Sequence, residues 1–414
     1  MIYPAAVAYM LKERWKYQNH RLSGEKNVKI TDIKAHIMSV PGPDGKTICR
    51  NWIFVEVCTD EGVSGIGEAT TEYHELAVAA QIESELKPRL LGMDPTDIEQ
   101  IWQLGYRDFW WKRGVVHTSA MSGIDQALWD IAGKVAGQPV FKMLGGKVRN
   151  RVRCYARPDF AADTVPEAAR QAVAEGFDAF KSGQEEMPDP FDPHALAKIE
   201  VEKFTQTRQA VGPDVDLMID CAGLHTPQSA HELVAGLAPL KMLFIEEPIE
   251  QSRVEPYLRL KRDFPEVYFS AGERWMTRWD CREWFEREAI DVCQVDISHT
   301  GGLSELMRIA SFAEIYGIQV APHNPYGPVA MAAAAHAAAA MPNFLILEHC
   351  RLRPWFEEVQ CLAVPIRGGY IDVGELAQRP GLGVELDMDL VHSRPHQPLT
   401  TRRKLNRDGA VGLY

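Results

Sequence analysis

Two kinds of hydrophobic spacing divide the first part of the chain. Between Val28 and Val57, apolar and polar residues alternate as they do along half-buried strands, and residues 41–45 interrupt the alternation with turn-forming types. From Ala77 to Gly137 the apolar residues recur at helical spacing instead. This order predicts a β-hairpin with a long loop followed by helices, which is typical of an α+β unit.

Beyond Arg151, short apolar runs alternate with amphipathic segments. One of these segments opens with Thr226 as N-cap and Pro227 at the first helical position, and another is the alanine-rich run from 332 to 340. Strands that alternate with helices form parallel sheets, and eight repeats over about 200 residues favour a closed (β/α)₈ barrel over an open sheet. The eight predicted strands are 152–156, 177–181, 215–220, 242–246, 267–271, 291–295, 318–321 and 343–347.

The predicted fold class is therefore α/β, a modified (β/α)₈ TIM-type barrel with an α+β capping domain built from the N-terminal part and the C-terminal segment. Residues 351–414 lose the alternation, so we expect them to pack back on the capping domain or to reach a neighbouring subunit. The predicted divisions are an N-terminal extension at 1–27, the capping domain at 28–150, the barrel domain at 151–350 and the C-terminal segment at 351–414.

Length, composition and charge narrow the classes of protein. The 414 residues exceed one ordinary core, and 46% hydrophobic with 25% charged residues is close to the average of soluble globular proteins. A net charge of −12 opposes a polyanionic partner, so no nucleic acid is expected to bind. No run approaches the roughly 18 apolar residues of a membrane span, so no membrane partner is expected.

The eight cysteines indicate a reducing compartment. They form no CxxC pair and no short regular spacing, which argues against both a zinc site and a disulfide framework. The apolar start from Ile2 to Leu11 has no basic region before it and is followed at once by Lys12, so we expect no signal peptide. A cytoplasmic location is predicted.

Three predicted strands in succession end in a carboxylate. In a barrel the catalytic groups lie at the C-terminal ends of the strands, and here strands three, four and five end in Asp220, Glu246 and Glu273, which are 26 and 27 residues apart. Carboxylates gathered at one rim repel one another unless a cation lies between them, and ligation by oxygen alone favours Mg²⁺. Each acid alone is more typical of a helix N-cap or a solvated rim. Glu247 is interpreted as a neighbour of the ligands.

The next strand ends supply a candidate general base. Strand six ends in Asp296 and strand seven in His323, and an Asp that hydrogen-bonds a His fixes its tautomer and raises its basicity. Glu348, which closes strand eight, either hydrogen-bonds a substrate or caps the strand. Lys181, which ends strand two, either points a cation toward the same mouth or forms a salt bridge on the rim.

Other signals are weaker. Gly301-Gly302 is interpreted as a tight turn after strand six, not as a phosphate-binding loop. The lone histidines His336 and His349 are interpreted as structural. Four aromatic and basic residues either line a pocket or merely pack, namely Trp110, Trp111, Arg113 and Arg157.

Several short segments complete the pattern: Gly67-Glu68-Ala69, Ser122 to Asp130, Leu144-Gly145-Gly146, Phe244 to Pro248, Gly272-Glu273-Arg274 and Ala321-Pro322-His323. With them the chain from about residue 28 onward resembles the enolase superfamily, in the branch of mandelate racemase and the acid-sugar dehydratases, and above all galactonate and mannonate dehydratases. The resemblance implies that Asp220, Glu246 and Glu273 bind Mg²⁺. It also implies that His323 with Asp296 is the base and that Glu348 contacts the substrate.

The chain departs from that pattern at two positions. Galactonate-type enzymes carry a catalytic His two residues past the first metal ligand, where this chain has Ala222, and racemase-like sites carry a second Lys where this chain has Gly183. His225, in the following loop, could reach back to bind the substrate. A single base argues against racemisation, because that reaction needs proton transfer on both faces. Dehydration does not, since His323 could abstract the proton and return it to a departing 3-hydroxyl on the same face.

The sequence thus favours a Mg²⁺-dependent dehydratase of a hexonate-like sugar acid. His323 would remove the proton α to the carboxylate to give a Mg²⁺-stabilised enediolate, and loss of the 3-hydroxyl would give a 2-keto-3-deoxy acid. The alternatives are a cycloisomerase or isomerase that uses the same enediolate, and a barrel that binds a sugar acid without catalysis. Substrate choice is assigned to the capping-domain loops at 41–51 and 70–75. Because members of the family usually assemble symmetrically, a homo-oligomer is expected.

Overall fold

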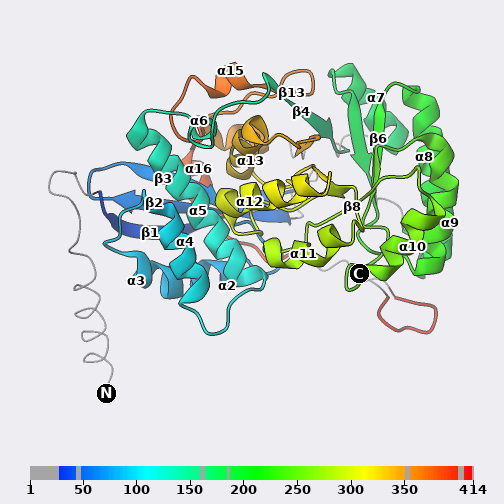
Figure 1. Cartoon of the computed structure of the whole chain (residues 1–414), viewed down its shortest axis with the longest axis horizontal. Helices are drawn as coiled ribbons and strands as arrows, with labels where there is room; N and C mark the ends of the chain where they lie inside the picture. Colours follow the sequence, from blue (N-terminus) through cyan, green and yellow to red (C-terminus); the bar gives the residue numbers. More distant parts are fainter. Residues whose placement is uncertain are drawn as a thin grey trace.

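The computed structural model describes residues 28–42, 48–158, 164–183, 187–349, 355–399 and 405–412. The predicted N-terminal extension, residues 1–27, lies outside the described residues. Figure 1 shows a cap of strands and helices beside a larger body of strands and helices. No helix in the described part of the chain combines the length and the apolar character that crossing a lipid bilayer requires.

An antiparallel sheet with the order β1-β2-β3 forms the core of the cap. The predicted hairpin is confirmed, because Ile33 pairs with Val57 and Ala35 with Val55, so the apolar positions of both strands share one face. The loop between the two strands lies partly outside the described residues. The strands are β1 (Ile30–Pro41), β2 (Ile48–Thr59) and β3 (Ser64–Glu68).

Helices cover this sheet, as the spacing from Ala77 to Gly137 predicts. The longest of them, α5, ends at the left-handed Gly137 and packs against β3. A buried polar series along α5 reaches out of the cap, since Asp125 accepts hydrogen bonds from the backbone and side chain of Ser304 in the barrel. The elements are α2 (Glu75–Ala80), η1 (Gln81–Leu86), α3 (Lys87–Leu90), α4 (Ile98–Arg107), α5 (Val115–Ala136) and α6 (Val140–Met143).

Eight parallel strands curl into the barrel sheet, in the order β10-β9-β8-β7-β6-β5-β4-β11. The first seven lie within or next to the predicted runs. Their N-terminal residues stay outside the ladder in several cases, so the strands are shorter than the apolar runs. The bounds are β4 (Arg151–Ala156), β5 (Ala179–Ser182), β6 (Asp216–Asp220), β7 (Phe244–Glu246), β8 (Phe269–Ala271), β9 (Val292–Cys293), β10 (Gln319–Val320) and β11 (Leu347–His349).

The eighth strand begins later than the sequence predicts. The predicted run 343–347 splits, because its first half pairs with β10 through a bridge between Val320 and Phe344, while β11 pairs with β4. The run therefore closes the sheet, because its first half contacts the seventh strand, β10, and its second half pairs with the first strand, β4. Glu348 is consequently the central residue of β11 rather than the residue that closes it.

Helices alternate with the strands and surround them (Figure 1). Thr226 caps α9 as predicted, with a capping box that it shares with Ser229. The chain leaves the (β/α)₈ repeat after β11. The barrel helices are α7 (Val165–Ala174), α8 (Pro193–Val211), α9 (Pro227–Leu237), η2 (Ala238–Leu240), α10 (Glu255–Asp263), α11 (Arg278–Glu286), α12 (Gly302–Ile315) and α13 (Pro328–Ala340).

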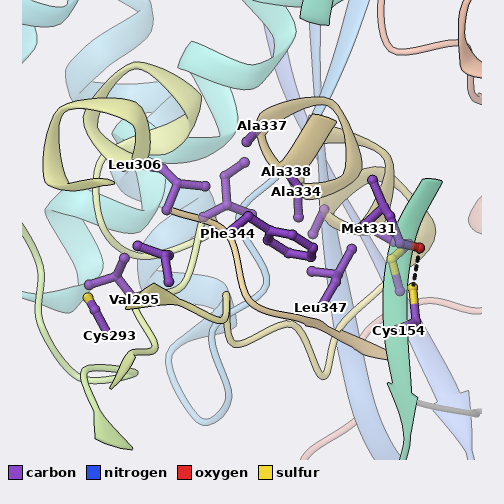
Figure 2. Packing of buried hydrophobic residues seen from close by; sticks show 14 of the residues in the cluster. Cys154, Cys293, Val295, Leu306, Met331, Ala334, Ala337, Ala338, Phe344 and Leu347 are labelled. Carbon is purple, nitrogen blue, oxygen red and sulfur yellow. Dashed lines mark hydrogen bonds between the residues drawn. The ribbon is translucent and has the colours of Figure 1, made fainter. Parts of the chain in front are cut away.

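The alanine-rich helix α13 is buried on every side. Small side chains let it pack closely, and Figure 2 shows Ala334, Ala337 and Ala338 beside Phe344 and Leu347. On its other side α13 contacts β3 and α6 of the cap. The run predicted as a barrel helix is confirmed, and it joins the barrel to the cap.

The described part of the C-terminal segment returns to the cap, as predicted. Helix α16 packs on β1, and Ser39 donates its backbone N–H to the carbonyl of Arg394 at 2.8 Å. The prediction did not include a second contact, in which β13 adds antiparallel to β4. The elements are α14 (Trp355–Glu358), β12 (Gln360–Leu362), β13 (Tyr370–Asp372), α15 (Val373–Leu376), β14 (Glu385–Leu386) and α16 (Met388–Ser393). Every cysteine that the structure describes is a free thiol.

Candidate active site

Three carboxylates meet at the C-terminal ends of neighbouring strands. Asp220 is the last residue of β6 and lies in register with Glu246, the last residue of β7, while Glu273 follows β8 by two residues. One oxygen of each carboxylate lies within 4.8 Å of the other two. The spacing of one βα unit thus brings the three predicted metal ligands together.

Burial and mutual repulsion disfavour the charged forms of these carboxylates. Burial raises the pKa of Glu246 to about 7, a rise that Lys181 opposes and that Asp220 and Glu273 reinforce. Burial also raises the pKa of Glu273 to about 7. Glu246 Oε1 is buried and has no hydrogen-bond partner among the described residues. Hard oxygen ligands with an unsatisfied lone pair fit a divalent cation such as Mg²⁺.

Lys181, on β5, extends into the same group. Its ammonium donates a hydrogen bond to Glu246 Oε2 at 2.6 Å and lies 3.3 Å from Glu348 Oε1. Burial disfavours the charged form, but the two carboxylates outweigh it and raise the pKa of Lys181 well above its usual value. The side chain has no exposed surface, so it is not a salt bridge on a solvated rim.

His323 and Asp296 form the pair that the strand order predicts. Beyond the ends of β9 and β10, an isolated parallel bridge between Asp296 and His323 sets the two residues side by side, with His323 Nδ1 at 2.7 Å from Asp296 Oδ2. Nε2 faces Glu273 Oε2 at 3.2 Å. Burial opposes protonation, yet Glu273, Glu348 and Asp296 together raise the pKa of His323 to about 10. The imidazole therefore holds a proton between the dyad partner and the carboxylates.

Glu348 and Arg157 connect this dyad to the three carboxylates. Arg157 Nη1 lies 3.2 Å from Glu348 Oε1 and 3.4 Å from Asp220 Oδ2. The other oxygen of Glu348 accepts a hydrogen bond from the backbone of Asn324 at 3.0 Å. Burial works against ionisation, but Lys181, His323 and Arg157 hold the pKa of Glu348 well below its usual range. Glu348 is therefore a buried carboxylate that stays charged.

Gly183 and Ala222, the two positions where the sequence departs from the pattern it resembles, provide no acid or base to the group. A Cβ at Gly183 would lie 1.9 Å from the carbonyl oxygen of Asp220, so the backbone of β6 closes the place where a second lysine was expected. Ala222 adopts a positive φ of 49° and donates its N–H to Asp220 Oδ1. The turn after β6 thus holds the carboxylate of Asp220, a predicted metal ligand, instead of presenting an acid or base side chain.

Glu247 lies next to the group but not in it. Its buried carboxylate pairs with Arg274 Nη1 at 2.7 Å, and Arg274 also lies 3.4 Å from Glu273. Arg274 donates a further hydrogen bond to the carbonyl of Ala222. This arginine therefore connects the ends of β6, β7 and β8, a role that the sequence did not suggest.

His225 does not join the site residues. Its imidazole is completely buried, and Nε2 lies 2.8 Å from Glu200 Oε2 on α8. Together with Cys221 these two side chains form a separate buried group of potential ligands. The expectation that His225 contacts substrate gains no support from this placement, because a partner 25 residues upstream holds its ring.

Of the four aromatic and basic residues, only Arg157 lies at the site. Trp110 and Trp111 are 88% and 87% exposed, so they neither pack nor line a pocket. Arg113 donates to the hydroxyl of Tyr106 within the cap. Trp110, Trp111 and Arg113 lie apart from the site because they belong to the connection between α4 and α5, on the periphery of the cap.

Tyr326, three residues after His323, connects the surroundings of this histidine to the cap. Tyr326 lies with its ring at 6.0 Å from that of His323 and bonds His299 at 2.9 Å through its hydroxyl. Arg50 of β2 stacks over Tyr326 and pairs with Glu72. Sequence reasoning placed Arg50 and Glu72 in the loops assigned to substrate choice but did not single them out. Their local sequence gives no functional signal, because Arg50 contacts Tyr326 in a distant segment of the chain.

Comparison with known proteins agrees with this architecture. Residues 45–145 match the mandelate racemase / muconate lactonizing enzyme N-terminal domain, and residues 164–390 match the enolase C-terminal domain-like family. A D-galactonate dehydratase of Ralstonia pickettii is 37% identical over 376 residues, which cover 88% of this chain and 96% of that protein.

Two solved structures are similar over nearly their whole length. One is an enolase of Agrobacterium radiobacter, described as a putative galactarate dehydratase with bound Na and L-malate (TM-score 0.84, 29% identity, 93% of this chain and 100% of that chain). The other is an enolase of Pantoea ananatis with bound D-gluconate and Mg (TM-score 0.83, 28% identity, 93% and 99%). With both of its domains matched, the chain belongs to the mandelate racemase / muconate lactonizing enzyme family of enolase-like proteins.

Proposed function

We propose that the protein is a Mg²⁺-dependent dehydratase that converts a hexonate-like sugar acid to a 2-keto-3-deoxy acid. The observation that carries the proposal is the His323–Asp296 dyad, whose Nε2 faces Glu273, one of the three clustered carboxylates. The D-galactonate dehydratase relative and the neighbour with D-gluconate and Mg support the class of reaction and of substrate.

Asp220, Glu246 and Glu273 would hold the metal ion. When bound, the ion supplies positive charge that attracts the substrate carboxylate and offsets the negative charge that develops there as the adjacent carbon loses its proton. The carboxylates that raise the pKa of His323 include Glu273. Glu273 would bind the ion as well as face His323, so with the site filled it would attract the imidazole proton less strongly and Nε2 could act as a base.

His323 performs both proton transfers in this proposal. Nε2 takes the proton from the carbon α to the substrate carboxylate, while Asp296 holds Nδ1–H and stabilises the imidazolium. The same Nε2 then protonates the 3-hydroxyl, the C–O bond breaks, and water leaves from the same face. The resulting enol tautomerises to the 2-keto-3-deoxy acid. A single base suffices, which fits the closed position at Gly183 and the methyl group at Ala222.

Lys181, Arg157 and Glu348 are assigned to the substrate end that carries the carboxylate. Lys181 is a buried ammonium whose charge stabilises negative charge that builds up next to Glu246. Arg157 and Glu348 provide donors and an acceptor for the carboxylate and the 2-hydroxyl group. His225 is no longer assigned to the substrate.

The test is a screen of hexonates, pentonates and aldarates with Mg²⁺ that detects 2-keto acids. We expect one or a few substrates for the native protein, and a loss of at least about 10³-fold in kcat/KM for His323→Asn, because the only base is removed. His194→Asn, at a half-exposed histidine on α8, is the matched control and should keep full activity.

Product analysis separates the alternatives. Dehydration yields a product that has lost one water, whereas a cycloisomerase or isomerase would yield a product of unchanged mass. Binding of a sugar acid without turnover, equal in native and His323→Asn protein, would indicate the non-catalytic barrel and refute the dehydratase.

A further inference from the structure

A second group of potential metal ligands lies behind the strand end that carries Asp220. Glu200 belongs to α8, Cys221 directly follows β6, and His225 lies in the turn after it. One ligand atom of each residue lies within 4.8 Å of the other two. All three residues are buried. The fold thus brings a carboxylate, a thiol and an imidazole together between a barrel strand and the helix that covers it.

This group faces away from the predicted magnesium ligands. Successive side chains along a strand point to opposite faces of the sheet. Met218 of β6 packs with residues of neighbouring strands such as Phe244, whereas Ile219 and Cys221 belong to the hydrophobic cluster that includes the barrel helices. Cys221 therefore points toward α8, while Asp220, one residue earlier, points to the opposite side with the other two carboxylates.

The polar atoms of the group are only partly paired. His225 Nε2 lies 2.8 Å from Glu200 Oε2. The second ring nitrogen, Nδ1, and the second carboxylate oxygen, Oε1, are both buried and have no hydrogen-bond partner among the described residues. Buried polar atoms without partners cost free energy, so folded proteins rarely keep them. A cation that is coordinated by such atoms removes this cost.

We propose that Glu200, Cys221 and His225 form a second metal site, which takes a zinc ion. Thiolate and imidazole ligands favour zinc over magnesium, which prefers oxygen alone. A tetrahedral zinc ion keeps its ligand atoms roughly 3.5 Å apart. The three ligand atoms, which lie within 4.8 Å of one another, need only small side-chain rotations to reach that spacing. The second oxygen of Glu200 or a water molecule is available for the fourth position.

The charges of the group suit a buried divalent ion. When zinc binds, the thiol proton of Cys221 leaves to solvent, and the thiolate and the carboxylate of Glu200 together carry two negative charges. With a neutral imidazole at His225 they balance the charge of the ion, so no net charge is buried. The spacing of the cysteines argues only against a site made of cysteine pairs, and this site uses a single cysteine.

A zinc ion at this place would tie α8 to the turn after β6. Backbone contacts already hold the turn on one side, since the N–H of Cys221 donates to the carbonyl of Glu246 at 3.0 Å and His225 forms a bridge with Ile249. The ion adds a link on the helix side. It would stabilise the turn that directly follows Asp220 without contacting the substrate, so the inference does not depend on the proposed reaction.

A purely structural group makes a different prediction. If His225 and Glu200 form only a buried hydrogen bond beside a buried thiol, no metal ion binds to the sulfur of Cys221. Zinc would then bind, if at all, only to the three carboxylates at the barrel mouth, where Mg²⁺ competes with it.

The first experiment titrates Co²⁺, a spectroscopic substitute for zinc, into the full chain after removal of bound zinc with a chelator. Excess Mg²⁺ is present throughout. We expect the near-ultraviolet charge-transfer band of a thiolate bound to Co²⁺ in the native protein and no band in Cys221→Ser. Cys154→Ser, at another buried free thiol on β4, is the matched control and should keep the band. A native protein without the band overturns the proposal.

Zinc content and melting temperature give two further readouts. In excess Mg²⁺ the native protein should hold about one zinc ion per chain by elemental analysis and should melt at a higher temperature with zinc than without it. Glu200→Gln and His225→Asn should lose both effects while circular dichroism shows them folded. Asp220→Asn should keep its zinc. Zinc that is lost in Asp220→Asn but retained in Cys221→Ser would place the ion among the three carboxylates and overturn the proposal.

Discussion

His336 and His323 are both buried imidazoles, yet their pKa values move in opposite directions. Burial disfavours the charged form of each. At His323 three carboxylates outweigh that effect and raise the pKa to about 10. At His336, within α13, the main partner is the carbonyl of Leu382, which offsets little, and burial lowers the pKa to about 4. Neighbouring charge, not residue type, decides whether a buried histidine is protonated or neutral near neutral pH.

His336 should therefore make stability depend on pH. Its folded pKa lies below the ordinary value of 6.5, so the contribution is fully present above pH 6.5 and is lost as pH falls toward 4, where only the unfolded chain takes up a proton. The loss amounts to about 3 kcal/mol of unfolding free energy. Urea unfolding across this range should show a smaller pH slope for His336→Gln than for the native protein. His194→Gln should keep the native slope, and equal slopes in all three proteins would contradict the assignment.

Glycines set the distance between β3 and α5, and through it the position of the cap core. A Cβ at Gly67 would lie 1.9 Å from the carbonyl oxygen of Gly123, and one at Gly65 would lie 2.1 Å from that of Ala127. Backbone atoms cannot move aside as a flexible side chain can. The short motif Gly67-Glu68-Ala69 thus marks a contact between two elements, and Glu68 extends it by accepting the N–H groups of Gly327 and Ala330 at the start of α13.

Replacing Gly67 should push β3 and α5 apart. We expect Gly67→Ala to lower the unfolding free energy by roughly 3 kcal/mol, the upper end for overpacking, because the clash is with backbone. Gly105→Ala is the control with the opposite expectation. A Cβ at Gly105, which lies inside α4, would be 3.5 Å from the flexible side chain of Met121, so it meets no backbone atom. Because alanine has the better helix propensity, stability should stay equal or rise. Thermal unfolding followed by circular dichroism measures both, and similar effects of the two substitutions would refute this account.

On the scale of the whole molecule, the proposed metal site depends on the pairing of neighbouring barrel strands. Asp220, Glu246 and Glu273 come from three strands and meet only when β6, β7 and β8 are in register. The unfolded chain cannot gather them, so a bound cation stabilises the folded state selectively. Burial chiefly raises the pKa of Glu246 and Glu273, and the same cation would relieve the repulsion between carboxylates that adds to this rise.

Magnesium should therefore raise the melting temperature, and a chelator should reverse the rise. At a concentration of a hundred times Kd the gain is about 2.7 kcal/mol. Differential scanning fluorimetry with and without Mg²⁺ should show this shift for the native protein and little shift for Asp220→Asn. Asp216→Asn, at the other end of β6 where Asp216 pairs with Arg153, should keep the full shift. A shift of equal size in Asp220→Asn would place the ion elsewhere.

The amino-acid pattern alone determined the alternation of strands and helices, the carboxylates that end three strands and the pairing of Asp296 with His323. These features repeat with the βα unit, so local spacing is enough to predict them. Tertiary structure decided the rest: β11 starts late because the preceding residues pair with β10, and His225 binds Glu200 on α8. The contact of Arg50 with Tyr326 likewise joins segments hundreds of residues apart. Such contacts follow from how packed elements dock, and no local periodicity encodes that docking.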